Sequence, residues 1–136
     1  MNDGPLPLPA ALYGIEGETT AVGFTMISEH KTGALLRTLA ASKPGGTFLE
    51  LGTGTGASTS WILDGMDAAA TLLTVDNEAR FVEIARRHLG HDRRVTFHID
   101  DCASFRRITH PAGSRRRLSL CVSRRFNSED RPLSLP

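Results

Sequence analysis

The sequence predicts an α/β fold built on a parallel β-sheet. Three short apolar runs, at 47–51, 71–75 and 94–99, alternate along the chain with segments of helical character. A loop with three alternating glycines directly follows the first run. Strands and helices at this spacing are typical of parallel strands joined by right-handed crossovers. With 136 residues, the chain has room for one such domain.

The first predicted helix covers residues 28–41 and precedes the first strand. Ser28 is a suitable N-cap, and the segment KPGG at 43–46 ends the helix. Its expected apolar stripe consists of Leu35, Leu36 and Leu39.

Two further helices are predicted between the strands. Residues 57–66 follow the first strand, and Trp61 is expected to pack where this helix meets the sheet. Residues 77–89 follow the second strand, and Gly90 ends this helix. The expected apolar face of the second of these helices consists of Phe81, Ile84, Ala85 and Leu89.

The glycine loop, within FLELGTGTGAST, indicates a ligand that approaches the main chain closely. Gly52, Gly54 and Gly56 lie between a strand and a helix, where free N–H groups can meet a nucleotide-type ligand. The loop loosely fits the G-x-G-x-x-A pattern of dinucleotide sites. Asp76 ends the next strand, twenty residues beyond Gly56. An acid there can accept hydrogen bonds from both ribose hydroxyls of an adenosine ligand.

Glu50 helps to distinguish between the possible classes of adenosine ligand. It lies two residues before Gly52, where a carboxylate would suit a cationic ligand and repel a pyrophosphate. The helix predicted at 28–41 points the same way, because dinucleotide domains often begin almost at their first strand. These features favour a methionyl or sulfonium-bearing ligand over a dinucleotide.

Several motifs together resemble class I S-adenosylmethionine-dependent methyltransferases. They are ELGTGTG, LLTVDNE and VTFHIDDCASF, and the upstream GFTMISEHKTGALLRTLAASKPGG resembles a bacterial O-methyltransferase-like branch. The resemblance covers residues 20–105. It implies the N-terminal half of a Rossmann-like doubly wound parallel sheet, with three strands. It also implies O-methyl transfer to a small molecule, with S-adenosyl-L-methionine as the cofactor.

By position, the resemblance implies a set of cofactor-binding residues. Glu50 and the three loop glycines would line the methionine and ribose, and Asp76 would hold the ribose hydroxyls. Asp101 and the Cys102 backbone would meet the adenine edge, and residues 24–31 would help to close the site. The complete set is Glu50, Gly52, Thr53, Gly54, Gly56, Asp76, Asn77, Asp101 and Cys102.

Each of these residues also has a purely structural interpretation. The glycines could form a tight turn without a ligand, and Glu50 could be a charge at a strand end. Asp76 could cap the helix that begins at Asn77. Asp101 could serve a turn. No catalytic residue is predicted, because the motif that would supply an acid or base near the methyl group is not recognisable.

The family pattern stops after about residue 105. Residues 1–19, which contain alternating Pro and Leu, are expected to form a flexible lead-in, and 20–105 a partial cofactor-binding domain. More than half of residues 106–136 are Arg, Ser or Pro, so an irregular, disordered tail is expected. We interpret the chain as truncated or frameshifted there, since possible codons for 115–123, read one base later, encode a strand-like AVDLVFAS.

Such a truncation would leave the first strand without a partner on one side. A bare apolar strand edge favours pairing with another chain, so self-association through this edge is expected. Two alternatives to a methyltransferase therefore stay open. They are a fragment of an NAD(P)-dependent oxidoreductase, and a non-catalytic interaction protein that pairs through its sheet edge. Because the part of the fold that would bind the methyl acceptor is not recognisable, the chain could also be an inactive methyltransferase.

Composition argues against several other classes of protein. The net charge of +1 gives no general case for binding nucleic acid or membranes. Cys102 and Cys121 form no CxxC pair, and the spacing of His88, His91 and His98 does not favour a metal site. The start of the chain lacks the pattern of a signal peptide, so a cytoplasmic location is expected.

Overall fold

A four-stranded parallel sheet organises this computed structural model, which describes residues 6–23, 29–102 and 118–123. The strand order is β3-β2-β1-β4, and each neighbouring pair is parallel. The predicted α/β class with a parallel sheet is therefore confirmed. The strands are β1 (Thr47–Leu51), β2 (Thr71–Asp76), β3 (Val95–Ile99) and β4 (Leu120–Ser123).

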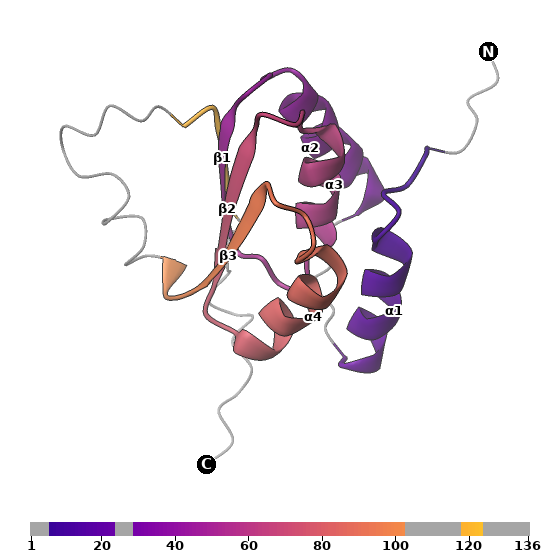
Figure 1. Ribbon diagram of the computed structural model, residues 1–136. Helices are drawn as coiled ribbons and strands as arrows, with labels where there is room; N and C mark the ends of the chain where they lie inside the picture. Colours follow the sequence, from indigo (N-terminus) through magenta and orange to yellow (C-terminus); the bar gives the residue numbers. More distant parts are fainter. Residues whose placement is uncertain (1–5, 24–28, 103–117, 124–136) are drawn as a thin grey trace.

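The helices α1 to α4, which belong to the described residues, lie on one side of the sheet (Figure 1). The first strand has the predicted bounds, and the second and third differ from prediction by one residue each. The two helices predicted at 28–41 and 77–89 each begin two residues later than expected. The helices are α1 (Leu12–Ala21), α2 (His30–Ala41), α3 (Ala57–Gly65) and α4 (Ala79–Leu89).

The main core lies between the sheet and these helices. Phe48 of β1 and Leu72 of β2 are register partners, and both pack in one cluster with Trp61 of α3. Burial of a large apolar side chain contributes about 1.5–3 kcal/mol, so this cluster is the main source of stability. The predicted packing role of Trp61 is confirmed, and it extends to α2, because a Cβ at Gly33 would collide with the indole ring.

Helix α2 turns a different face to the core than its leucine pattern suggested. Leu36 is buried, but Leu35 is 57% exposed and Leu39 is 38% exposed. The buried face instead runs through Gly33, Leu36 and Ala40, since small residues allow α2 to lie close to α3. Ser28, the expected N-cap, lies outside the described residues.

Residues 1–19 were expected to form a flexible lead-in, but α1 shows that residues 12–19 are helical, while residues 1–5 lie outside the described residues. Leu12, Ile15 and Thr19 follow one another at helical spacing, and all three are buried. The helical period was hard to see because the segment contains two glycines. One of them, Gly14, lies close to His88, because a Cβ there would lie 2.7 Å from Cε1 of this side chain, which would then have to shift.

Strand β4 shows that two expectations were wrong. The sheet has more than the three expected strands, and the tail is not wholly irregular. Leu120 and Val122 alternate with more exposed residues and pack against the main core, while β4 pairs with β1 along Phe48–Leu51. Composition averaged over the tail concealed this four-residue alternation. The edge of β1 is thus covered, so the expectation of self-association through a bare β1 edge loses its basis. The rest of the predicted tail lies outside the described residues.

None of the helices in the described ranges combines the length and the apolar character that crossing a membrane requires.

Candidate functional site

The glycine loop joins the carboxyl end of β1 to α3. Gly52, Gly54 and Gly56 have φ values of 103°, 54° and 98°, in the left-handed region that favours glycine. The N–H groups of Gly52 and Thr53 both donate to the carbonyl of Val75, at 2.7 and 3.2 Å. These bonds hold the start of the loop against the end of β2.

Asp76 connects this loop to the start of α4. Its Oδ2 accepts a hydrogen bond from the N–H of Gly54 at 2.7 Å, and its Oδ1 accepts one from the N–H of Glu78 at 3.0 Å. The N-cap of α4 is Glu78, so Asp76 lies before the cap and not at it. The side chain is buried, and both contacts are with main-chain N–H donors.

The end of β3 reaches the same region. The thiol of Cys102 lies 3.6 Å from the carbonyl of Val75, and the N–H of Asp100 donates to the carbonyl of Asp76. Burial, followed by the negative charges of Asp76 and Asp101, raises the pKa of the Cys102 thiol above its ordinary value. The structure therefore brings Asp76, Asp101 and Cys102 together at one edge of the sheet.

The predicted residues form a buried floor and an exposed rim. Residues 52–56 and Asp76 are buried, whereas Asn77 and Asp101 are exposed and Cys102 is half-buried. Such an arrangement can place the main chain of the loop below a ligand and carboxylates beside it.

Gly56 has contacts that differ from those of the other two glycines. Its N–H donates to the carbonyl of Thr53 at 3.1 Å, inside the loop. A Cβ at Gly56 would lie 2.8 Å from the Cβ of Ala85 on α4. These contacts explain the glycine through the close packing of the loop against α4.

Glu50 lies beneath the loop and is 1% exposed. Its carboxylate accepts hydrogen bonds from three hydroxyls: Thr59 at 2.5 Å and Thr74 at 2.7 Å on Oε1, and Ser58 at 2.8 Å on Oε2. Thr74 also lies 2.6 Å from the hydroxyl of Thr53 in the loop. Glu50 thus connects β1 with β2, α3 and the loop.

Sequence reasoning missed these hydroxyl partners. Thr74 lies between the apolar residues Leu73 and Val75 of β2, and the register places it directly opposite Glu50. A polar residue within a buried strand was the available signal, but only the strand pairing identifies its partner. Helix α1 also reaches the loop, since the hydroxyls of Thr19 and Thr55 lie 2.8 Å apart.

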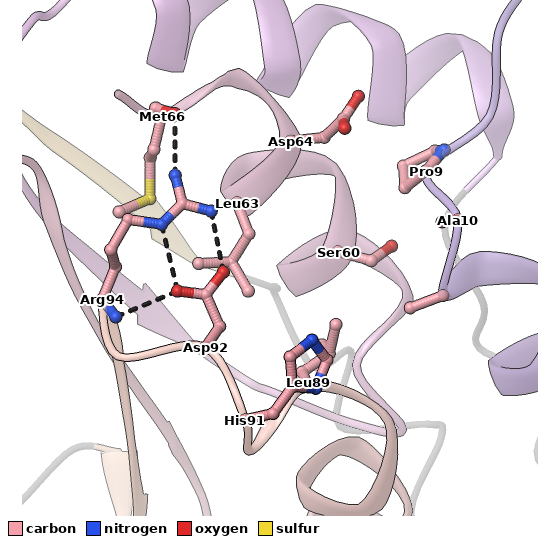
Figure 2. Close-up of a pocket in the computed structure, with 11 residues that line it drawn as sticks. Pro9, Ala10, Ser60, Leu63, Asp64, Met66, Leu89, His91, Asp92 and Arg94 are labelled. Atoms are coloured by element: carbon pink, nitrogen blue, oxygen red, sulfur yellow. Dashed lines mark hydrogen bonds and ion pairs between the residues drawn. The ribbon is translucent and has the colours of Figure 1, made fainter. Parts of the chain in front are cut away.

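A separate cavity of about 360 Å³ lies at the amino end of the sheet (Figure 2). It is bordered by the segment before α1, by α3 and by the residues that precede β3. Arg94 donates to Asp92 at 2.7 and 3.0 Å and to the carbonyl of Met66 at 2.7 Å. None of the predicted cofactor residues lines this cavity.

A comparison of sequences and a comparison of structures with known proteins both bear on the family. A protein of Mycobacterium tuberculosis named a probable O-methyltransferase is 33% identical over 85 residues, which are 62% of this chain. The solved O-methyltransferase TomG of Streptomyces achromogenes, in complex with SAM, has a TM-score of 0.70 at 22% identity and covers 80% of this chain. An O-methyltransferase of Bacillus cereus in complex with SAH has a TM-score of 0.67 at 22% identity and covers 79%.

This chain is similar in sequence and in fold to proteins named as O-methyltransferases. The relatives found by sequence and those found by structure have this activity in their names, and the class I fold is common to them, as the resemblance implied. No protein-family profile matches the chain. The chain spans 38% of the length of the M. tuberculosis O-methyltransferase and 51% of each of the two solved O-methyltransferases.

The described part of the chain holds no group of three or more His, Cys, Asp or Glu side chains placed to bind a metal ion.

Proposed function

We propose that this chain forms the S-adenosylmethionine-binding part of an O-methyltransferase that acts on a small molecule. The observation that supports this most strongly is the junction of Asp76 with the loop. A buried carboxylate lies within hydrogen-bond distance of a loop N–H, next to two glycines with left-handed backbone. This combination suits an adenosine ligand whose ribose meets a carboxylate while its other end lies against the main chain of the loop.

The residues of the loop region fit the cofactor. Asp76 would hold the ribose, Gly52 and Gly54 would lie against the methionyl part, and Asp101 and Cys102 would lie near the adenine. Asn77 and Thr53 complete the set. When bound, the cofactor supplies an electrophilic methyl group. The role of this chain is to bind and orient it.

The names of the relatives support the reaction class. TomG was solved with SAM and the B. cereus protein with SAH, which is why S-adenosylmethionine is the cofactor in the proposal. The acceptor and any general base are not assigned to residues of this chain, so the proposal includes an inactive, cofactor-binding form. The expected cytoplasmic location stays a prediction.

Of the two alternatives, the oxidoreductase fragment has no support among the relatives compared above. The interaction protein was expected to pair through β1, and β4 covers that edge. Neither alternative gains a specific observation from the described residues.

Calorimetric titration with S-adenosylhomocysteine tests the proposal. The wild-type chain is expected to bind saturably, and Asp76→Ala to weaken binding by at least about tenfold, because hydrogen bonds to a charged group contribute about 1.5–3 kcal/mol. Asp76→Asn keeps the shape and is expected to lie between the two. An excess of NAD should not compete.

Asp64→Ala is the matched control, since Asp64 lies at the cavity at the amino end of the sheet, away from the loop. It should bind like wild type. Absence of binding by a folded wild-type chain, or equal binding by Asp76→Ala, would contradict the proposal.

A further inference from the structure

The carboxylate of Glu50 is enclosed by hydroxyl donors. Glu50 is the penultimate residue of β1, opposite Thr74 of β2, and it is 1% exposed. Ser58 and Thr59 of the first turn of α3 donate to it from one side, and Thr74 donates from the other. A direct contact with a ligand would have to compete with these three short hydrogen bonds.

Hydroxyl geometry gives this network a direction. A hydroxyl carries one proton, and a carboxylate accepts only. Thr74 directs its proton to Glu50, so the 2.6 Å contact between Thr53 and Thr74 requires Thr53 to be the donor. The chain of hydrogen bonds therefore runs from the loop, at Thr53, through Thr74 to Glu50.

Glu50 consequently holds the loop at both ends. Thr53 is held at the start through Thr74, while Ser58 and Thr59 are held just after the loop enters α3. The N-cap of α3 is Gly56, which has no side chain to satisfy the first amides of the helix. A carboxylate below this turn is also stabilised by the positive end of the helix dipole.

We propose that Glu50 is a positioning residue, which shapes the cofactor loop through its hydroxyl partners and does not itself touch the cofactor. This inference rests on the proposed function for the identity of the ligand. It replaces the direct methionine contact that the sequence suggested. The main-chain N–H groups of the loop then depend on Glu50 for their directions.

Four variants separate positioning from direct contact. Glu50→Gln replaces one accepting oxygen by a donor, and Thr74→Val removes the hydroxyl at constant shape. Thr74→Ser keeps the hydroxyl and removes only the methyl group. The double variant Glu50→Gln/Thr74→Val tests whether the two act through one network. Ile62→Val on α3 is the control for general destabilisation, since it changes the core and leaves the network intact.

The first measurement is the affinity for S-adenosylhomocysteine by calorimetry. Glu50→Gln and Thr74→Val should each weaken binding by about tenfold or more, since each breaks hydrogen bonds to a buried carboxylate. The double variant should be no weaker than the weaker single variant. Thr74→Ser and Ile62→Val should bind like wild type. Loss of binding in Glu50→Gln with full binding in Thr74→Val would overturn the proposal in favour of direct contact.

The second measurement needs no ligand. Amide hydrogen exchange of a peptide covering residues 52–56 should accelerate at least several-fold in Glu50→Gln and in Thr74→Val, relative to the exchange of α4. Unchanged exchange in both variants would overturn the proposal. If the wild-type chain binds no S-adenosylhomocysteine, the proposed function fails, and the exchange measurement alone decides whether Glu50 positions the loop.

Discussion

The aspartates at the two ends of the sheet have different hydrogen-bond partners. At the amino end, Asp92 is neutralised by Arg94, which also donates to a main-chain carbonyl. At the carboxyl end, Asp76 accepts only from main-chain N–H groups, and within the described residues it has no ion-pair partner. An aspartate that is paired with an arginine has a structural role. An aspartate that is held by main-chain amides can still accept hydrogen bonds from a ligand. This difference supports the proposal that the cofactor binds at the carboxyl end of the sheet.

The largest expected effect comes from changing the loop. Gly56→Ala should lower the free energy of unfolding by about 2–5 kcal/mol, combining left-handed strain of about 1–2 kcal/mol with overpacking of about 1–3 kcal/mol. The reason is its φ of 98° and the approach of Ala85 to its Cβ position. Denaturant melts would measure the change.

Gly17→Ala is the matched control for this prediction. Gly17 lies on α1 with nothing within 4 Å of its Cβ position. The substitution should be stabilising by about 0.5–1 kcal/mol, because it removes a helical glycine. If Gly56→Ala were no more destabilising than Gly17→Ala, the loop would not be tightly packed at Gly56.

A smaller effect is expected at the amino end. A hydrogen bond from the Arg94 side chain is the main cause that lowers the pKa of Asp92 below 3.8. Because the folded-state pKa is depressed, its contribution is complete above the unfolded-state value and is lost as the pH falls through the folded-state value. Asp92→Asn should cost about 1 kcal/mol at pH 7. It should match wild type once the pH is well below 4, and it should leave S-adenosylhomocysteine affinity unchanged.

Melting curves across pH for this variant sharpen the comparison of the two ends. Asp64→Asn is the control, since Asp64 pairs with Arg37 but is 43% exposed. It should change stability by less than about 0.5 kcal/mol at any pH. A loss of ligand affinity in Asp92→Asn would show that the two ends are coupled.

The smallest effect concerns thiol reactivity at the carboxyl end. The raised pKa of Cys102, caused first by burial and then by Asp76 and Asp101, should make it alkylate at least about tenfold more slowly at pH 8 than the exposed Cys121. Mass spectrometry after iodoacetamide treatment measures both sites. Asp101→Asn should accelerate Cys102 and leave Cys121 unchanged. Equal rates at the two cysteines would contradict the electrostatic description of this edge.

Sequence reasoning was most successful where a local pattern and a turn signal coincided. TFLEL lies between PGG and GTG, and β1 has the predicted bounds. Asp76 was placed correctly at the end of β2, beside the loop. In both cases the relevant information lies within a few residues.

It failed where structure depends on partners far along the chain. Helix α1 is stabilised by burial of Leu12 and Ile15 against elements dozens of residues away, and its glycines hide the pattern. Strand β4 has only four residues and forms by pairing with β1. The donors to Glu50 become apparent only when the β1–β2 register and the start of α3 are known.

The packing of Trp61 also makes the intrinsic tryptophan fluorescence of the protein a probe of its fold. It is the sole tryptophan of the chain, fully buried, with Arg37 4.7 Å above its ring and Gly33 of α2 against its edge. Within the described residues its indole N–H has no hydrogen-bond partner, so its emission should resemble that of indole in an apolar solvent. Because Trp61 lies one helical turn beyond the glycine loop, a shift of its spectrum would report separation of α2 from α3 without any added label.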